Sequence, residues 1–501
     1  MRETRLMLAA AVAMLLAGCQ ADGGGDTGDD AVQHYGKIAF TPCTLATPYS
    51  TRTIAAKCAT LPVAEDPQAP DGRRIDLHLA WLPATRPGAA TDDPVFYLAG
   101  GPGQAAMETW PSIDEAFSEV RKQRHVILLD QRGTGKSHPL RCKDDSGANA
   151  YSDGTDLGEE ANRRFAQRCA ESLDADPRHY GTTDAVRDLD SVRQALGVEK
   201  INLVGSSYGT RVAQQYAMRH PQHTRTIVID GVVPNELVLG SEHARNLDQA
   251  LALQFEHCQE SPACKARYGS DMREQLRALM QRLQAQPQTV QYRDPSSGEL
   301  REDKATDATV AGLTRIFSYA PHAAALLPLV LSEADQGRYG PLMALSRMLQ
   351  NQLGEQFSHG MQLSVICSED ADLLQSNPDD AATVLGNTLN DALKAQCTGW
   401  PVNPRPQDFH APLKTDVPAL LLSGELDPVT PPRYGDQVVA HLPKGRHLVL
   451  KGQGHGTFAV SCMPKLVSQF IEKADAAALD AGCLDNLDYV PPFTGFNGWE
   501  P

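Results

Sequence analysis

Residues 201–209 read Ile-Asn-Leu-Val-Gly-Ser-Ser-Tyr-Gly, and they decide how the rest of the chain is interpreted. The first four residues form a short, mainly apolar run, which is typical of a strand buried on both faces of a parallel sheet. The last five form a Gly-x-Ser-x-Gly pattern, and residues 208–218 continue with helical spacing. A strand, a tight turn and a helix in this order expose a serine hydroxyl as a nucleophile. Ser207 is the favoured nucleophile, because Ser206 lacks the flanking glycine spacing.

Six further segments predict strands. Residues 74–82 alternate apolar and polar side chains, as a half-buried strand does. The other five segments are continuous apolar runs at residues 95–98, 126–129, 226–229, 419–422 and 447–450. Helical spacing lies between several of these runs, for example at residues 185–196. Strands that alternate with helices predict an α/β fold, with a mostly parallel central sheet and helices on both faces.

The alternation of strands and helices stops at about Val233 and resumes near Pro412. The patterns between these points predict helices at residues 247–258, 272–284 and 342–353. We therefore expect a helical cap over residues 233–411, inserted between two parts of one α/β core. The two core parts are residues 37–232 and residues 412–501, the second of which includes a C-terminal tail.

A serine nucleophile needs a base, and the base needs a carboxylate that orients it. His455 lies in a glycine-rich loop directly after the predicted strand 447–450, and Asp427 follows the predicted strand 419–422. We predict a triad of Ser207, Asp427 and His455, with Glu425 as the fallback carboxylate. The alternatives are a surface-turn aspartate and a solvated loop histidine.

Residues 100–104, Gly-Gly-Pro-Gly-Gln, follow the predicted strand 95–98. Glycines at this place allow backbone N–H groups to point at an oxyanion. We assign one donor to Gly101 and the second to Tyr208, the residue after the nucleophile. The alternative is an ordinary Gly-Pro turn.

Residues 130–137, Asp-Gln-Arg-Gly-Thr-Gly-Lys-Ser, suggest a phosphate-binding loop at first sight. That pattern requires glycine at position 130, where this chain has Asp130. The formal net charge of −16 argues against nucleic acid as a partner, because phosphate binding needs clustered cations. No two cysteines are spaced as Cys-x-x-Cys, which disfavours a zinc site, and a serine triad needs no metal or organic cofactor.

The N-terminus predicts export. Arg2 and Arg5 precede an apolar run at residues 6–16, which is too short to span a bilayer, and Leu-Ala-Gly-Cys ends at Cys19. Residues 1–18 resemble a bacterial lipoprotein signal peptide, which implies that Cys19 carries lipid and is the only membrane anchor. The alternative is a plain signal peptide. Residues 19–36 predict a flexible tether, and Gln20 favours the outer over the inner membrane by resemblance to sorting patterns.

The cysteine count agrees with export. Of the 11 cysteines, ten remain if Cys19 is lipidated, and disulfides persist in an oxidising compartment. Sequence alone leaves many pairings open. We predict nearest-neighbour pairs: Cys43–Cys58, Cys142–Cys169, Cys258–Cys264, Cys367–Cys397 and Cys462–Cys483.

Six segments together carry a family resemblance. They are residues 100–103, 130–135, 205–209, 230–234, 424–430 and 452–456. With them, residues 40–485 resemble the prolyl and tripeptidyl aminopeptidase family of α/β-hydrolase serine peptidases, and the long insertion is closer to the secreted tripeptidyl type. The resemblance implies an α/β-hydrolase fold. It also implies release of one or a few residues (aminoacyl, prolyl or tripeptidyl) from the free N-terminus of peptides, through an acyl-enzyme.

The resemblance also implies that acidic cap residues hold the substrate ammonium group. Residues 367–370, Cys-Ser-Glu-Asp, resemble the segment concerned, so Glu369 and Asp370 are the candidates. The alternative is a solvated acidic turn. The chain departs from short family members at Ala99, where they have histidine.

Two other functions stay open at this point. A carboxylesterase uses the same triad, and a non-catalytic lipoprotein could bind peptides on the same scaffold.

Overall fold

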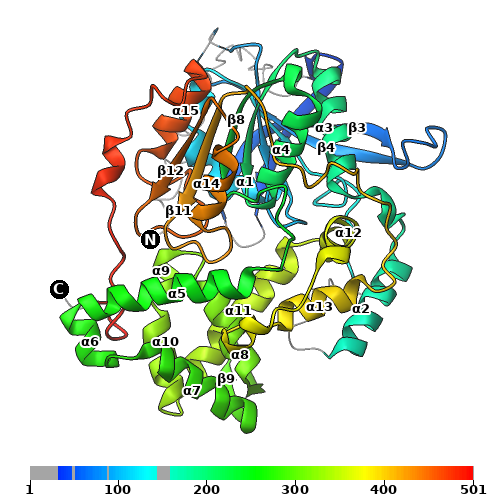
Figure 1. The fold of residues 1–501 in the computed structure, drawn as a ribbon. Coiled ribbons are helices and arrows are strands. Elements are labelled where there is room, and N and C mark those ends of the chain that lie inside the picture. The colour runs from blue at the N-terminus through cyan, green and yellow to red at the C-terminus, as the bar shows by residue number, and fades with distance from the viewer. Residues whose placement is uncertain (1–31, 48–50, 87, 89, 144–157, 500–501) are drawn as a thin grey trace, which may run out of the picture.

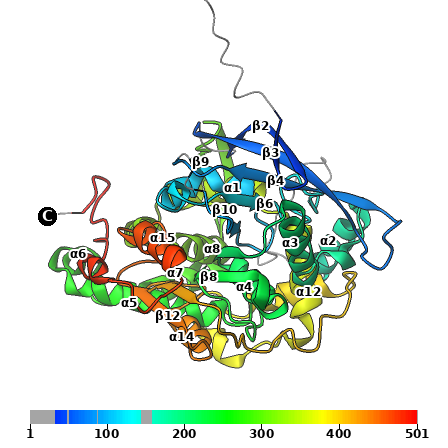
Figure 2. The same ribbon diagram turned by 90° about the horizontal axis from the view of Figure 1, so that it is seen from above.

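The computed structural model describes residues 32–47, 51–86, 88, 90–143 and 158–499 (Figure 1). The predicted signal peptide 1–18 and Cys19 lie outside the described residues. Within the described ranges the core is one ten-stranded sheet, in the order β1-β2-β3-β4-β6-β5-β7-β8-β11-β12. Its layers are seen most clearly from above (Figure 2).

Six neighbouring strands of this sheet, in the order β6-β5-β7-β8-β11-β12, pair in parallel. They are β6 (Val126–Leu129), β5 (Val95–Leu98), β7 (Ile201–Ser206), β8 (Thr224–Asp230), β11 (Ala419–Gly424) and β12 (Gly445–Leu450). All residues of β5, β6 and β11 are buried. The predicted mostly parallel sheet is therefore confirmed, and six of the seven predicted strands form this parallel part.

The other edge of the sheet is antiparallel. It consists of β1 (Gln33–Tyr35), β2 (Ile38–Ala46), β3 (Thr53–Ala64) and the predicted β4 (Arg74–Leu82). The first three strands were not predicted, because β3 is mostly half-exposed and carries no clear alternation. The expected tether 19–36 was wrong at its C-terminal end, where β1 pairs with β2 and Tyr35 packs against Trp81.

Each face of the sheet is covered by helices (Figure 2). On one face, α1 (Ala106–Ile113) and α15 (Met463–Lys473) pack over a cluster that includes Val95 and Tyr97 of β5. On the other face, α3 (Thr182–Leu196), α4 (Tyr208–Arg219) and α14 (Pro432–Val439) pack over a cluster that includes Phe96 and Leu98 of β5. The alternation along β5 thus divides its side chains between two cores. Burial of one such side chain contributes about 1.5–3 kcal/mol.

The chain between β8 and β11 forms a helical insertion, which fills the lower part of Figure 1 and has a hydrophobic core of its own. Its helices are α5 (His243–Glu260), α6 (Pro262–Tyr268), α7 (Met272–Ala285), α8 (Asp307–Phe317), α9 (Pro321–Ala324), α10 (Leu327–Asp335), α11 (Gly340–Gln356), α12 (His359–Glu369) and α13 (Thr388–Cys397). A hairpin of β9 (Gln288–Arg293) and β10 (Leu300–Ala305) was not predicted, because β10 is almost wholly polar and exposed. One more helix, α2 (Glu159–Ser172), precedes α3 and packs on α13.

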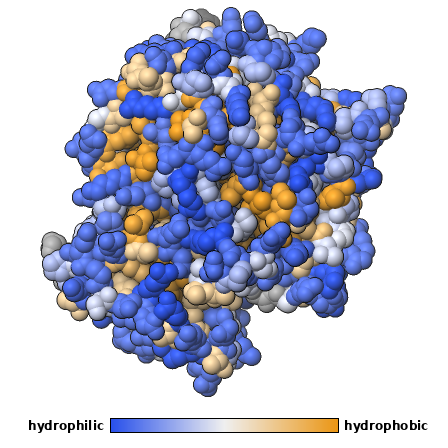
Figure 3. Space-filling model, in the orientation of Figure 1, coloured by the Kyte–Doolittle hydropathy of each residue, from blue (hydrophilic) through white to orange (hydrophobic). Residues whose placement is uncertain are grey.

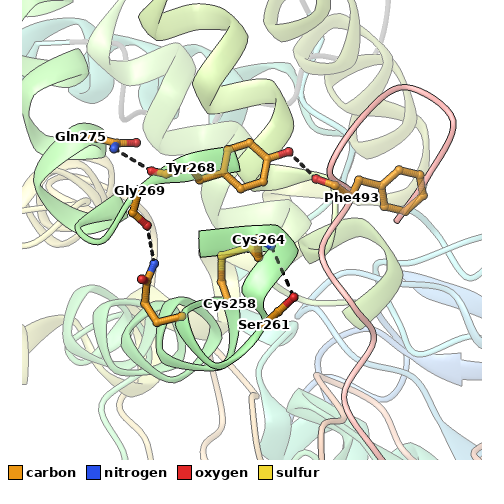
Figure 4. The surroundings of a disulfide bond; sticks show 8 residues. Cys258, Ser261, Cys264, Tyr268, Gly269, Gln275 and Phe493 are labelled. Atoms are coloured by element: carbon orange, nitrogen blue, oxygen red, sulfur yellow. Dashed lines mark hydrogen bonds between the residues drawn. A yellow bond between two sulfur atoms is a disulfide. The ribbon is translucent and has the colours of Figure 1, made fainter. Parts of the chain in front are cut away.

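The structure contains all five disulfides that nearest-neighbour pairing predicts. Cys258–Cys264 joins α5 to α6, as Figure 4 shows. Beside it, the hydroxyl of Tyr268 donates a hydrogen bond to the carbonyl oxygen of Phe493 in the C-terminal tail. The N–H of Phe493 donates to the carbonyl of Ala325 at 2.8 Å. The C-terminal tail therefore packs on the insertion at two points.

No helix in the described part of the chain is long and apolar enough to cross a membrane. The face in Figure 3 is mainly hydrophilic, with separate apolar patches at its left side and near its centre. Exposed large apolar side chains at scattered positions are ordinary for a protein surface.

Candidate active site

The turn between β7 and α4 places Ser207 in a strained conformation. Its φ of 53° and ψ of −124° lie outside the regions that non-glycine residues usually occupy. A Cβ atom at Gly209 would lie 2.2 Å from the carbonyl oxygen of Leu98, and one at Gly205 would lie 2.4 Å from that of Gly209. The two glycines of the pattern are therefore required by the tight turn. Such local strain costs about 1–3 kcal/mol and is concentrated at functional sites.

His455 and Asp427 meet as the sequence order predicts. Nδ1 of His455 lies 2.7 Å from Oδ2 of Asp427, whose side chain is wholly buried. The N–H groups of Val429 and Thr430 donate to Oδ1 of the carboxylate at 2.9 and 2.8 Å. Burial by itself would raise the pKa of Asp427, but the charge of His455 and these hydrogen bonds outweigh it and lower that pKa. Asp427 therefore stays ionised.

The same ion pair has the opposite effect on the pKa of the imidazole, which it raises. Burial by itself would lower the pKa of His455, but the negative charge and the hydrogen bond of Asp427 raise it above the ordinary value of 6.5. The fallback carboxylate, Glu425, has other partners: it accepts hydrogen bonds from Gly452 N–H and from the hydroxyl of Tyr489, each at 2.9 Å.

The end of β8 brings the serine turn and the histidine loop together. Ser207 N–H donates to the carbonyl of Asp230 at 2.9 Å, and a Cβ atom at Gly231 would lie 2.9 Å from Cε1 of His455. The buried carboxylate of Asp230 accepts hydrogen bonds from the N–H groups of Thr457 and Phe458 at 2.5 and 2.8 Å. Residues 230 and 231 thus contact both the nucleophile's backbone and the imidazole ring.

The glycine-rich loop 100–104 lies beside Ser207. A Cβ atom at Gly100 would lie 3.1 Å from Cβ of Ser207, and Gly101 has a φ of 111°. Tyr208 is the first residue of α4, and the first N–H groups of a helix have no partner within the helix. Gly101 and Tyr208 therefore belong to the two segments next to Ser207. Their role as oxyanion donors stays a prediction.

Two buried side chains of the segment 130–137 hold it in place. Asp130 accepts hydrogen bonds from Met107 N–H, at the start of α1, and from Lys136 N–H, at 2.9 and 3.3 Å. Burial raises the pKa of Asp130 to about 7. Arg132 makes a buried, two-point ion pair with Asp188 at 2.6 and 2.7 Å.

Sequence reasoning missed Thr430 and His243. The hydroxyl of Thr430 donates to Oδ2 of Asp427 at 2.8 Å and lies 3.1 Å from Nδ1 of His455, so it touches both members of the pair. Its position three residues after Asp427 was the available signal. Burial, with smaller effects from the charges of Arg315 and His455, lowers the pKa of His243 to about 3. His243, at the start of α5, is therefore neutral beside the site.

The two cap acids do not form a solvated turn. Asp370 and Glu369 are buried at the end of α12, where Arg211 Nη1 lies 2.9 Å from Asp370 and 3.7 Å from Glu369. Burial raises the pKa of Glu369 to about 7, and its Oε1 accepts a hydrogen bond from Thr182 N–H at 2.6 Å. The hydroxyl of Thr182 lies 2.7 Å from that of Tyr208, so Glu369 is linked to the nucleophile helix. A role of either acid toward the substrate stays a prediction.

Comparisons with known proteins agree with this geometry. A family model described as "alpha/beta hydrolase fold" matches residues 93–256, and one described as "TAP-like protein" matches residues 382–483. The serine protease Hip1 of Mycobacterium tuberculosis is 27% identical over 92% of this chain and 94% of its own.

Two further relatives match over a shorter length. The tripeptidyl aminopeptidase of Streptomyces coelicolor is 30% identical over 40% of this chain and 39% of its own. Carboxylesterase B of M. tuberculosis is 31% identical over 42% of this chain and 43% of its own. Of these three relatives, the one that matches over most of both chains is named a serine protease.

The raised pKa of His455 predicts the pH profile of hydrolysis. A general base must be neutral, so kcat/KM should rise with pH through a midpoint above 6.5. Asp427→Asn removes the negative charge, which should move that midpoint to lower pH and reduce kcat by roughly 10⁴-fold. Measurement of kcat/KM between pH 4 and 9 checks both effects. A midpoint that does not move in Asp427→Asn would contradict the pairing.

The buried ion cluster predicts a stability effect. Arg211→Met leaves Asp370 buried without its cation, which should reduce the free energy of unfolding by about 3–5 kcal/mol. The double variant Arg211→Met/Asp370→Leu should recover part of this loss, because no unpaired charge remains at position 370. Urea unfolding followed by circular dichroism measures the free energy of unfolding of both variants. Equal losses of this free energy in the single and double variants would contradict the pairing of Arg211 with Asp370.

Proposed function

We propose, from the premise that this chain belongs to the α/β-hydrolase family of serine peptidases, that it is an exported exopeptidase. It releases one or a few residues from the free N-terminus of peptides, in the aminoacyl, prolyl or tripeptidyl manner. The observation that carries the chemistry is the 2.7 Å hydrogen bond between His455 and Asp427 beside the strained turn of Ser207.

The reaction follows from the arrangement of these groups. Ser207 Oγ attacks the scissile carbonyl carbon while His455 Nε2 takes the hydroxyl proton. The N–H groups of Gly101 and Tyr208 stabilise the oxyanion, a contribution of about 2.7–4 kcal/mol for each donor in known cases. His455 then gives its proton to the leaving amine, and the C–N bond breaks to leave an acyl-serine. Water deprotonated by His455 hydrolyses the ester and restores the hydroxyl of Ser207.

Three observations support a peptide end as the substrate. The helical insertion contributes residues next to the triad, among them His243 and Tyr319, and so limits the space around it. Glu369 is an acid linked through Thr182 to Tyr208, on the helix that the nucleophile precedes. Two of the relatives are named as a serine protease and a tripeptidyl aminopeptidase.

Export is supported by the five disulfides, which persist in oxidising compartments. We also propose that Cys19 carries a lipid that holds the protein on the periplasmic side of the cell envelope. The Leu-Ala-Gly-Cys sequence at residues 16–19 supports this anchor.

A carboxylesterase is the second candidate. The same triad hydrolyses esters, and one relative is named carboxylesterase B. The two functions differ in the group that the site recognises. An exopeptidase must bind the ammonium group of its substrate, whereas the substrate of an acyl esterase carries no ammonium group.

A peptide library with free N-termini, analysed by mass spectrometry, distinguishes these functions. We expect products shortened by one to three residues from the N-terminus. N-acetylation of the same peptides should reduce kcat/KM by about 10–100-fold, as the loss of a hydrogen bond to a charged group does. Ser207→Ala is the control and should abolish turnover. Internal cleavage, or hydrolysis of short acyl esters without peptide cleavage, would contradict the proposal.

A further inference from the structure

The helical insertion makes backbone contacts with both loops that the reaction uses. We infer that the insertion is a positioning element of the catalytic apparatus: Tyr319 fixes the loop of His455, and Ser358 fixes the oxyanion loop. This inference rests on the proposed function, because it assumes that both loops take part in the reaction.

The first contact is at His455. Its backbone N–H donates to the carbonyl oxygen of Tyr319 at 2.7 Å, and the Tyr319 ring meets the imidazole edge-on with centroids 5.3 Å apart. The preceding residue leaves no space between the two segments, because a Cβ atom at Gly454 would lie 2.2 Å from the Tyr319 carbonyl oxygen. The insertion is therefore in direct contact with His455, the proposed base.

The second contact is at the oxyanion loop. Ser358 N–H donates to the carbonyl oxygen of Gly103 at 3.0 Å, and the adjacent Phe357 forms an antiparallel bridge with Gln104. A Cβ atom at Gly103 would lie 2.8 Å from the carbonyl oxygen of Ser358. This contact is two residues from Gly101, the proposed oxyanion donor.

The two contacts come from one packed unit. Tyr319 follows α8, Ser358 follows α11, and these two helices pack against each other. Phe317 of α8 and Leu342 of α11 are buried in the same hydrophobic core. The packing of α8 on α11 therefore sets the distance between the histidine loop and the oxyanion loop.

The two catalytic loops need such external support. The oxyanion loop contains Gly100, Gly101 and Gly103, and the histidine loop contains Gly452, Gly454 and Gly456. Glycine loses more conformational freedom on folding than any other residue, so glycine-rich loops are held only where contacts fix them. In this fold the insertion provides contacts at both loops.

Proline at position 358 tests the oxyanion contact. Ser358 has φ −85° and ψ 94°, and Phe357 has φ −115° and ψ 133°, which are near the values that proline and its preceding residue adopt. Ser358→Pro removes the N–H donor, while Ser358→Ala, the reference, keeps it. We expect kcat of Ser358→Pro to fall at least about 10-fold below that of Ser358→Ala, with KM for a peptide amide and the melting temperature much less affected. A shift of about 1 Å in the position of a catalytic group can reduce the rate roughly 100-fold.

Gly454→Ala tests the histidine contact. The added methyl group must push the loop away from Tyr319, which should weaken the pairing of His455 with Asp427. We expect kcat to fall by roughly 100-fold and the acid-side pH midpoint of kcat/KM to move down toward 6.5. The matched control is Gly312→Ala in α8, where a Cβ atom has no neighbour within 4 Å and activity should be unchanged.

The outcomes separate the inference from the proposed function. Folded Ser358→Pro with the kcat of Ser358→Ala, together with an unmoved pH midpoint in Gly454→Ala, would overturn the inference and leave the proposed function intact. If Gly454→Ala does not fold, the comparison of kcat between Ser358→Pro and Ser358→Ala decides whether the inference holds. A wild-type protein that neither turns over peptides nor reacts with a fluorophosphonate would overturn both.

Discussion

The hydrogen bond between His455 Nδ1 and Asp427 Oδ2 is the interaction on which the whole site depends. A carboxylate that is wholly buried is costly unless it is paired and hydrogen-bonded. Here two backbone N–H groups and the hydroxyl of Thr430 share Asp427 with the imidazole. The carboxylate consequently stays ionised and stabilises a positive imidazole, which is the property that a base needs when it takes a proton from a serine hydroxyl.

Parallel strand order explains why distant segments meet at this point. The carboxyl ends of β7, β8, β11 and β12 lie at one edge of the sheet, and Ser207, Asp230, Asp427 and His455 follow or end those strands. Asp230 binds the turn after His455 with its carboxylate and the N–H of Ser207 with its carbonyl. The sheet thus provides one side of the site, and the insertion provides the other through Tyr319 and Ser358.

Much of this arrangement could be predicted from the sequence, because buried parallel strands are short apolar runs and catalytic loops follow them. In the main sheet, β4 and the six parallel strands were predictable in this way. The pairing of the ten cysteines after Cys19 rested on a different argument, that neighbours in the sequence pair. Strands β1 to β3 were not predictable, although consecutive strands pair here, because polar and apolar residues are mixed along them and few of their side chains are buried. Contacts across the fold were also beyond sequence reasoning: Thr430 bridges two triad members, and Glu369 and Asp370 are buried against Arg211, a partner 158 or more residues away in the chain.

The most direct test of the central claim is the site and rate of reaction with a fluorophosphonate, followed by peptide mapping. If Ser207 is activated by the His455–Asp427 pair, the label is on Ser207 and not on Ser206, and His455→Gln slows labelling by several orders of magnitude while the protein stays folded. A label on another serine, or labelling of Ser207 at an unchanged rate in His455→Gln, would contradict the account.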